Sequence, residues 1–95
     1  LAQISIPPSV TSIGEFAFAM CSSLEQVLIP SSITKIEKSA FEQCSKLSQI
    51  NIPPSVISIG DYCFADCISL KPFQIPSSVI SIGKDIFKRK NYRRF

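Results

Sequence analysis

The sequence contains no histidine and only three glycines, and charged residues make up 18% of its 95 residues. Without histidine, the chain lacks the base of a Ser-His-Asp or Cys-His catalytic set and the nitrogen ligand of many zinc sites. Three separate glycines form no loop that cradles a phosphate. No apolar run reaches the roughly 18 residues that a membrane span needs. The sequence therefore predicts no enzyme activity, no catalytic residue, no metal site, no cofactor and no membrane span.

A repeat of 23 residues accounts for nearly the whole chain, of which 45% is hydrophobic. Its four copies occupy residues 1–23, 24–46, 47–69 and 70–92. Six columns are identical in all copies, and in the second copy they are Leu24, Ile29, Pro30, Ser32, Ile36 and Phe41. A period of about 20 to 29 residues that opens with L-x-x-I-x-I is typical of a leucine-rich solenoid. Chance similarity does not keep six columns at a constant period, so we expect one structural unit per copy.

The residue order within one copy predicts a strand, a turn, a second strand and a short helix. In the second copy the L-x-x-V-x-I pattern ending at Ile29 is typical of a short strand, and Pro30 stops it because proline has no N–H to donate. A second short strand is expected around Ile36, and the spacing from Ala40 to Cys44 predicts the helix. One such unit cannot bury its own apolar face. Successive units should therefore stack, with about 4.8 Å between neighbouring strands.

The pattern L-x-x-I-x-I-P-x-S-V-x-S-I-G-x-x-x-F-x-x-C-x-S, as it stands from Leu47 to Ser69, resembles the BspA-like leucine-rich repeat. The resemblance covers residues 1–92. It implies an α/β solenoid, a right-handed coil with parallel β-strands and a short helix per 23-residue turn. It also implies a noncatalytic protein-protein interaction scaffold, a fragment of a longer surface adhesion or host-binding protein that is secreted or held at the cell surface.

Two columns depart from the repeat. Glu37 stands where the other copies carry glycine, which indicates that this column does not require a positive φ. Lys90 stands where the other copies carry cysteine, and a charge there predicts that the fourth copy is a C-terminal cap. No comparable polar residues cover the first copy, so we expect further repeats upstream. Its apolar residues would otherwise face water, namely Leu1, Ile4 and Ile6.

Three of the four cysteines, Cys21, Cys44 and Cys67, form one column on the inward side of the predicted helix. Side chains stacked in parallel point alongside one another, so we interpret these residues as reduced core thiols. Disulfide bonding or redox use is the alternative. Cys63 lies four residues before Cys67, at a spacing that suits a metal, but its column otherwise holds alanine. A small core filler is the plainer interpretation.

The outward residues of the first strands form the predicted protein-binding face, because alternate residues of a strand point to opposite sides. This face is polar and mostly uncharged, which favours a protein ligand over phosphate or lipid. Pro72 interrupts its glutamine column. The alternative is a solvated sheet face without a ligand. The predicted face comprises Gln3, Ser5, Glu25, Gln26, Leu28, Ser48, Gln49, Asn51, Lys71 and Gln74.

The basic character of the chain resides in residues 84–95, which carry a net charge of +5, whereas residues 1–83 carry −2. Basic residues interleaved with aromatics indicate a nucleic acid or an acidic protein surface as partner. The alternative is a solvated cap whose aromatics pack on the last coil. A polyanion site would make the chain an intracellular structural subunit of a large assembly, anchored to RNA or an acidic filament, and the compartment stays open. The candidate polyanion-binding residues are Lys88, Arg89, Lys90, Arg93 and Arg94.

Overall fold

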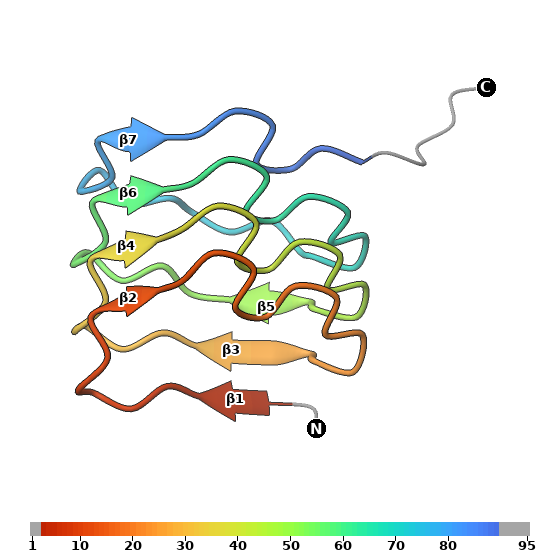
Figure 1. Cartoon of the computed structure of the whole chain (residues 1–95), viewed down its shortest axis with the longest axis horizontal. Coiled ribbons are helices and arrows are strands. Elements are labelled where there is room, and N and C mark those ends of the chain that lie inside the picture. Colours follow the sequence, from red (N-terminus) through yellow and green to blue (C-terminus); the bar gives the residue numbers. More distant parts are fainter. Residues whose placement is uncertain (1–2, 90–95) are drawn as a thin grey trace.

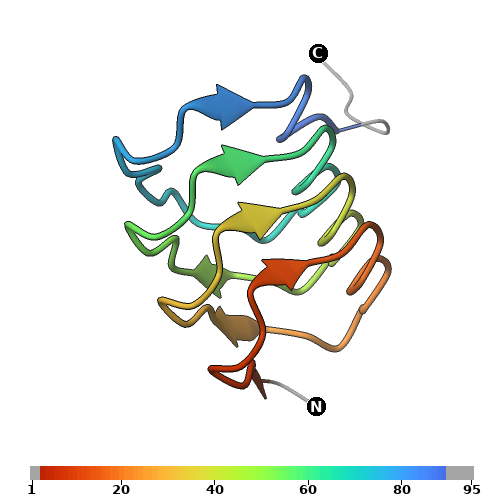
Figure 2. The same cartoon turned by 60° about the vertical axis from the view of Figure 1, so that its left-hand side comes forward.

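Each copy of the repeat folds as one coil of a stack in the computed structural model, which describes residues 3–89 (Figure 1). We number the coils 1 to 4 after the repeat copies. Coil 1 lies at one end of the stack and coil 4 at the other, and successive coils lie one above the next (Figure 2). Strand pairs join neighbouring coils, as expected for a solenoid. Within residues 3–89 no helix is long and apolar enough to cross a membrane.

Two parallel sheets form two sides of the stack, which confirms the predicted parallel strands. Sheet A contains β1 (Gln3–Ser5), β3 (Gln26–Leu28) and β5 (Gln49–Ile50). Sheet B contains β2 (Ser12–Ile13), β4 (Lys35–Ile36), β6 (Ser58–Ile59) and β7 (Ser81–Ile82). The strands of the two sheets run in opposite directions in Figure 1. Gln26 pairs with both Gln3 and Gln49, so the register advances by one repeat per coil.

The turn between the two sheets explains the invariant proline and serine columns. In every coil the proline carbonyl accepts the N–H three residues later, with N···O distances of 3.1 to 3.2 Å. The serine that follows ties the turn to the preceding coil: Ser55 Oγ donates to the carbonyl of Ile33 at 2.7 Å, and Ser78 Oγ donates to Val56 at 2.9 Å. Ser32 differs, because its buried Oγ has no partner among the described residues. These columns thus fix both the turn and its stacking.

The third side of each coil consists of successive turns, so the short helix predicted from Ala40 to Cys44 is absent from the described residues. Alternate N–H groups on this side donate to carbonyls of the next coil. In coil 2 the donors are Ser39, Phe41 and Gln43, with N···O distances of 2.8 to 2.9 Å to coil 3. The N–H groups between them donate three residues back along the chain. This side is therefore a ladder of turns that binds one coil to the next.

Backbone dihedral angles explain why a helix does not form there. Two residues four positions apart have positive φ in each of the first three coils, and in coil 2 they are Ser39 at 57° and Gln43 at 60°. An α-helix needs negative φ throughout. For a residue other than glycine the left-handed region costs about 1 kcal/mol or more, and the hydrogen bonds between coils offset that cost.

The core lies between the two sheets and the turn ladder, and a column of phenylalanines runs along it. The Phe18 and Phe41 rings stack at a centroid distance of 5.4 Å, Phe41 and Phe64 at 5.6 Å, and Phe64 and Phe87 at 6.0 Å. Phe41 and Phe64 are buried, whereas Phe87 is 50% exposed. Because each inner ring contacts both neighbouring coils, the core of every coil depends on the coils beside it.

The glycine column confirms that no positive φ is needed, because none of the glycines has one. Gly60 and Gly83 instead allow the backbones of neighbouring coils to approach closely, because glycine has no side chain. A Cβ at position 60 would lie 2.7 Å from the carbonyl carbon of Glu37 in the preceding coil, and a Cβ at position 83 would lie 2.6 Å from that of Gly60. At Gly14, in coil 1, the same Cβ would meet nothing within 4 Å.

The two ends of the stack differ from the expectations in one respect. Ile6 is only 9% exposed rather than open to water, because Ile4 and Val10 of its own coil pack against the same core cluster. Ile4 is half-buried, and Leu1 lies outside the described residues. In coil 4, Ile82 is 52% exposed on β7. Lys90, on which the predicted cap depends, also lies outside the described residues, so the cap stays a prediction.

Candidate protein-binding face

The outer surface of sheet A brings the predicted glutamine column together. Gln3, Gln26 and Gln49 stand in direct register on β1, β3 and β5, and the apolar residues that follow them point into the core. Gln3 and Gln49 are exposed and Gln26 is half-buried. Successive side chains of an extended strand point to opposite faces of the sheet, so each glutamine points outward and the aliphatic residue that follows it points toward the core. The structure thus places a row of amide groups across three coils.

A shallow hollow of about 210 Å³ lies on this face between β3 and β5. Gln26, Leu28, Gln49 and Asn51 line it together with Val27 and Ile50. Leu28 is 43% exposed, although it stands in a sheet column that is otherwise polar. An exposed aliphatic side chain surrounded by amide groups offers a partner protein both apolar contact and hydrogen bonds. The hollow is therefore the centre of the candidate face.

The side chain of Asn51 hydrogen-bonds to the preceding coil, which the strand pattern does not predict. Its Oδ1 accepts the N–H of Ile29 at 3.2 Å, and its Nδ2 donates to the carbonyl of Ile29 at 3.3 Å. The side chain thereby prolongs the pairing of β3 with coil 3 beyond the last backbone pair. Ser48 also bonds to the preceding coil, from its Oγ to the carbonyl of Glu25 at 3.3 Å. These two side chains stabilise the face as well as lining it.

In coil 4 the face loses its sheet. Lys71 and Gln74 are exposed there, as are Ser5 and Glu25 in the earlier coils. The N–H of Lys71 donates to the carbonyl of Ser48 at 3.1 Å, and the pairing then stops at Pro72, which has no N–H. The first strand that the repeat predicts for coil 4 is therefore absent.

The candidate polyanion residues fall partly outside the described residues. Lys88 and Arg89 are exposed, whereas Lys90, Arg93 and Arg94 lie beyond residue 89. Lys88 belongs to the turn ladder, where its N–H donates to the carbonyl of Asp85 at 3.1 Å. The polyanion site therefore stays a prediction.

The cysteine column points into the core, as predicted. Cys44 and Cys67 are buried and Cys21 is half-buried, and none of the cysteines is bonded to another. The Sγ of Cys44 donates to the carbonyl of Phe18 at 3.1 Å, and that of Cys67 donates to Phe41 at 3.0 Å. Each thiol thus links its coil to the preceding one through a backbone carbonyl.

Burial keeps these thiols protonated. It raises the pKa of Cys44 from 9.0 to about 11 and that of Cys67 to about 12, although hydrogen bonds to the backbone act in the opposite direction. Cys63 is buried beside Cys67, and burial raises its pKa furthest. Among the described residues, no group of three or more His, Cys, Asp or Glu side chains is placed to hold a metal ion. The cysteines act here as small core residues rather than as nucleophiles.

A second hollow lies at the end of coil 4. Its lining includes Phe73 and Phe87, which belong to no site predicted from the sequence, together with Lys71 of the predicted face and Arg89 of the candidate polyanion residues. Two departures from the repeat signal it. Phe73 occupies a column that is otherwise aliphatic, and Pro72 precedes it.

A family model described as a BspA type leucine rich repeat region, with six copies, matches residues 1–95. No curated protein matches the chain. Among solved structures, the chain is similar to a leucine-rich repeat protein of Bacteroides ovatus, with a TM-score of 0.87 and 41% identity over 92% of this chain and 25% of that chain.

Two further structures are similar. A leucine rich repeat protein of T. pallidum gives a TM-score of 0.84 and 31% identity, over 88% of this chain and 42% of that one. A leucine rich cell surface protein of Faecalibacterium prausnitzii gives a TM-score of 0.86 and 34% identity, over 90% of this chain and 23% of that one. The chain thus spans less than half the length of each of these proteins.

Proposed function

Since the chain belongs to the BspA type leucine-rich repeat family, we propose that it is part of a noncatalytic scaffold that binds a protein through the outer face of sheet A. The observation that carries this proposal is the hollow between β3 and β5, where exposed Leu28 lies among Gln26, Gln49 and Asn51. Solenoids of this kind present extended sheet surfaces to their partners.

An adhesion role at the cell surface is the finer form of the proposal. The similar protein of Faecalibacterium prausnitzii is described as a cell surface protein, which supports this setting for the present chain. The chemistry of the face agrees with a protein partner, because amide groups and one aliphatic side chain match the mixture of polar and apolar groups on protein surfaces.

The test is binding of the full chain to a panel of immobilised extracellular matrix proteins, compared with a variant carrying Leu28→Asp. A charge in the centre of the hollow should weaken binding at least tenfold. A tenfold loss corresponds to about 1.4 kcal/mol of binding free energy, and changing a central interface residue commonly costs that much or more. Ile57→Asp is the matched control, because Ile57 is 42% exposed and Leu28 is 43% exposed, and Ile57 lies beside sheet B. Equal losses in both variants would contradict the proposal.

Salt dependence separates this proposal from the alternative of an anchored structural subunit. Binding by uncharged side chains should change little with ionic strength. Contact with a polyanion through Lys88, Arg89 and the basic residues that follow should instead weaken steeply, by close to one unit of log-log slope per phosphate. Binding that survives Leu28→Asp but is abolished when those basic residues are neutralised would favour the alternative.

A further inference from the structure

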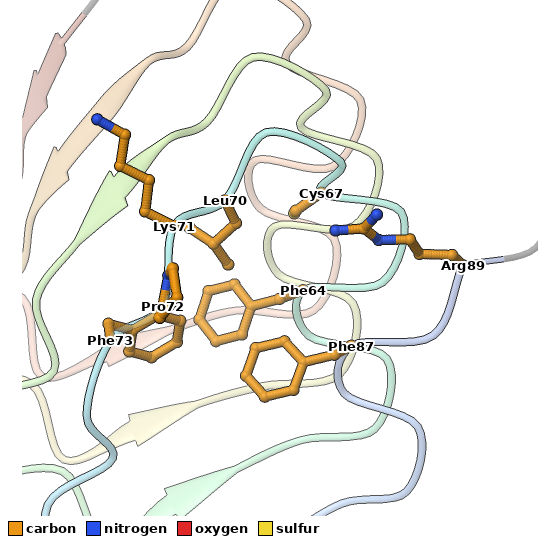
Figure 3. Close-up of a pocket in the computed structure, with 8 residues that line it drawn as sticks. All are labelled: Phe64, Cys67, Leu70, Lys71, Pro72, Phe73, Phe87 and Arg89. Carbon is orange, nitrogen blue, oxygen red and sulfur yellow. The ribbon is translucent and has the colours of Figure 1, made fainter. Parts of the chain in front are cut away.

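A hollow of about 300 Å³ opens at the C-terminal end of the core (Figure 3). The rings of Phe64, Phe73 and Phe87 lie together on one side of it, with Leu70 next to them, and the side chain of Arg89 extends over it from the turn ladder. The site is separate from the hollow on sheet A, which lies between β3 and β5.

Three phenylalanine rings form a corner at this hollow. Phe64 and Phe87 stack at 6.0 Å with an angle of 18°. Phe73 stands edge-on to both, at 5.5 Å and 72° from Phe64 and at 5.8 Å and 70° from Phe87. Phe87 is 50% exposed, so one face of the stack remains open to a ligand. Offset-stacked and edge-on contacts are the two arrangements that aromatic pairs prefer, and this corner offers both.

The corner exists because coil 4 departs from the repeat. Pro72 replaces the glutamine of the earlier coils, and no strand forms between residues 71 and 75. Phe73 replaces the aliphatic residue that Ile4, Val27 and Ile50 supply in the other coils. An ordinary coil would present a small aliphatic side chain here, whereas coil 4 presents an aromatic ring.

The charged residues that line the hollow have one sign. Lys71 and Arg89 are its charged lining residues, and all the others are apolar or cysteine. In Figure 3 the guanidinium of Arg89 points toward Cys67, above the rings, whereas the ammonium of Lys71 points away from them. A guanidinium in this position can pair with a carboxylate through two parallel hydrogen bonds. The hollow is therefore complementary to an apolar ring that carries a negative charge beside it.

We infer that this hollow binds an aromatic side chain from an acidic segment of a partner protein. The ring of a phenylalanine or tyrosine packs against Phe73 and Phe87, and a neighbouring aspartate or glutamate pairs with Arg89. The site adds a second contact on the same chain and does not depend on what the face of sheet A binds.

The experiment uses a fluorescent synthetic pentapeptide in which a central phenylalanine is flanked by two aspartates on each side, titrated into the full chain and followed by anisotropy. Phe87→Ala and Arg89→Gln should each weaken binding about fivefold to tenfold, because each removes one of the two recognition elements. The matched controls are Phe16→Ala, at a residue that is 53% exposed at the other end of the stack, and Lys46→Gln on an exposed turn. Both should bind as the parent chain does.

Phe73→Ile restores the aliphatic residue of the repeat and keeps the inference testable if Phe87→Ala fails to fold. It should weaken binding of the peptide while leaving the circular dichroism spectrum unchanged. Leu28→Asp on sheet A should have no effect, so failure of this site and failure of the face of sheet A are distinguishable.

Two outcomes would overturn the inference. One is equal affinity for a peptide in which alanine replaces the phenylalanine, since binding would then depend on charge alone. The other is unchanged affinity after both Phe73→Ile and Arg89→Gln, since the peptide would then bind elsewhere on the chain.

Discussion

Sheet A ends after three strands, whereas sheet B continues through all four coils, and both are built from the same repeat. In sheet B the fourth copy keeps the Ser-Ile pair, and Ser81 and Ile82 stand in register with Ser58 and Ile59. In sheet A the fourth copy carries Pro72 where a donor is needed. One coil can therefore keep one strand and lose the other, which means that strand formation on each side of the solenoid depends on the residues of that side alone.

The inner and outer coils differ in a second way, through burial. Identical residues of one column have different exposures: Phe41 is 0% exposed in coil 2, and Phe87 is 50% exposed in coil 4. Ile36 and Ile59 are buried, but Ile82 of the same column is 52% exposed. The stability that a conserved column contributes should therefore depend on how many neighbouring coils cover it.

The largest expected effect tests this dependence directly. Phe41→Ala should lower the free energy of unfolding by about 3 to 5 kcal/mol, because a fully buried ring that stacks on both sides leaves a cavity when it is truncated. Phe87→Ala should lower it by clearly less, since half of that ring is already exposed. Urea unfolding of both variants provides the measurement. Equal losses would show that position in the stack does not matter.

The next effect, of about 100-fold, concerns the cysteines. Near pH 8 the thiolate fraction of Cys44 should be about 100-fold lower in the folded than in the unfolded chain, because burial raises its pKa from 9.0 to about 11. Its reaction with a disulfide reagent should slow accordingly, and half-buried Cys21 should react first. Mass spectrometry of the labelled residues gives the order.

The sign of the accompanying pH dependence follows from the raised pKa. Below pH 9.0 the thiol is protonated in both the folded and the unfolded chain, so the stabilisation is fully present. As the pH rises from 9.0 toward about 11, the unfolded chain loses the proton first, and the free energy of unfolding falls. Rapid labelling of Cys44 under folding conditions would contradict the buried position of this column.

The sequence correctly predicts the strands of sheet B, the first strands of coils 1 to 3, the inward columns and the outward glutamines, because these depend on period and alternation, which are local properties. The first strand that it predicts for coil 4 does not form. The prediction also fails at Ala40 to Cys44, because Ser39 and Gln43 have positive φ and their N–H groups donate to carbonyls of the next coil. No glycine or turn motif in the sequence indicates this. The amide of Asn51 and the ring of Phe73 are likewise placed by contacts between coils. The repeat pattern predicts that a residue such as Asn51 is exposed, but it does not predict that the side chain hydrogen-bonds to the backbone of the preceding coil.

A smaller effect is expected from Asn51→Ala. The variant loses two hydrogen bonds to the backbone of Ile29, which should lower the free energy of unfolding by about 1 kcal/mol. Gln74→Ala is the matched control, because Gln74 occupies the same column in coil 4, where sheet A has already ended. Urea unfolding should show little change for the control. A loss as large in Gln74→Ala as in Asn51→Ala would mean that the bonds of Asn51 contribute no specific stability.

The smallest change in stability should come from Pro72→Gln, which nevertheless bears most directly on the difference between the two sheets. Restoring the glutamine supplies an N–H that can pair with the carbonyl of Ser48, to which Lys71 already donates. One added hydrogen bond gains about 1 kcal/mol, and the greater freedom of the unfolded chain without proline removes about 0.4 to 1 kcal/mol, so the two terms nearly cancel.

Hydrogen exchange of the Pro72→Gln variant is the informative measurement: the new amide should be protected as a fourth strand of sheet A forms. Pro54→Ser, at an exposed turn position where two copies already carry serine, should leave exchange in coil 4 unchanged. If the amide at position 72 exchanges as fast as an amide in an unstructured chain, the strand is absent because of the ring of Phe73 and not because Pro72 lacks an N–H donor.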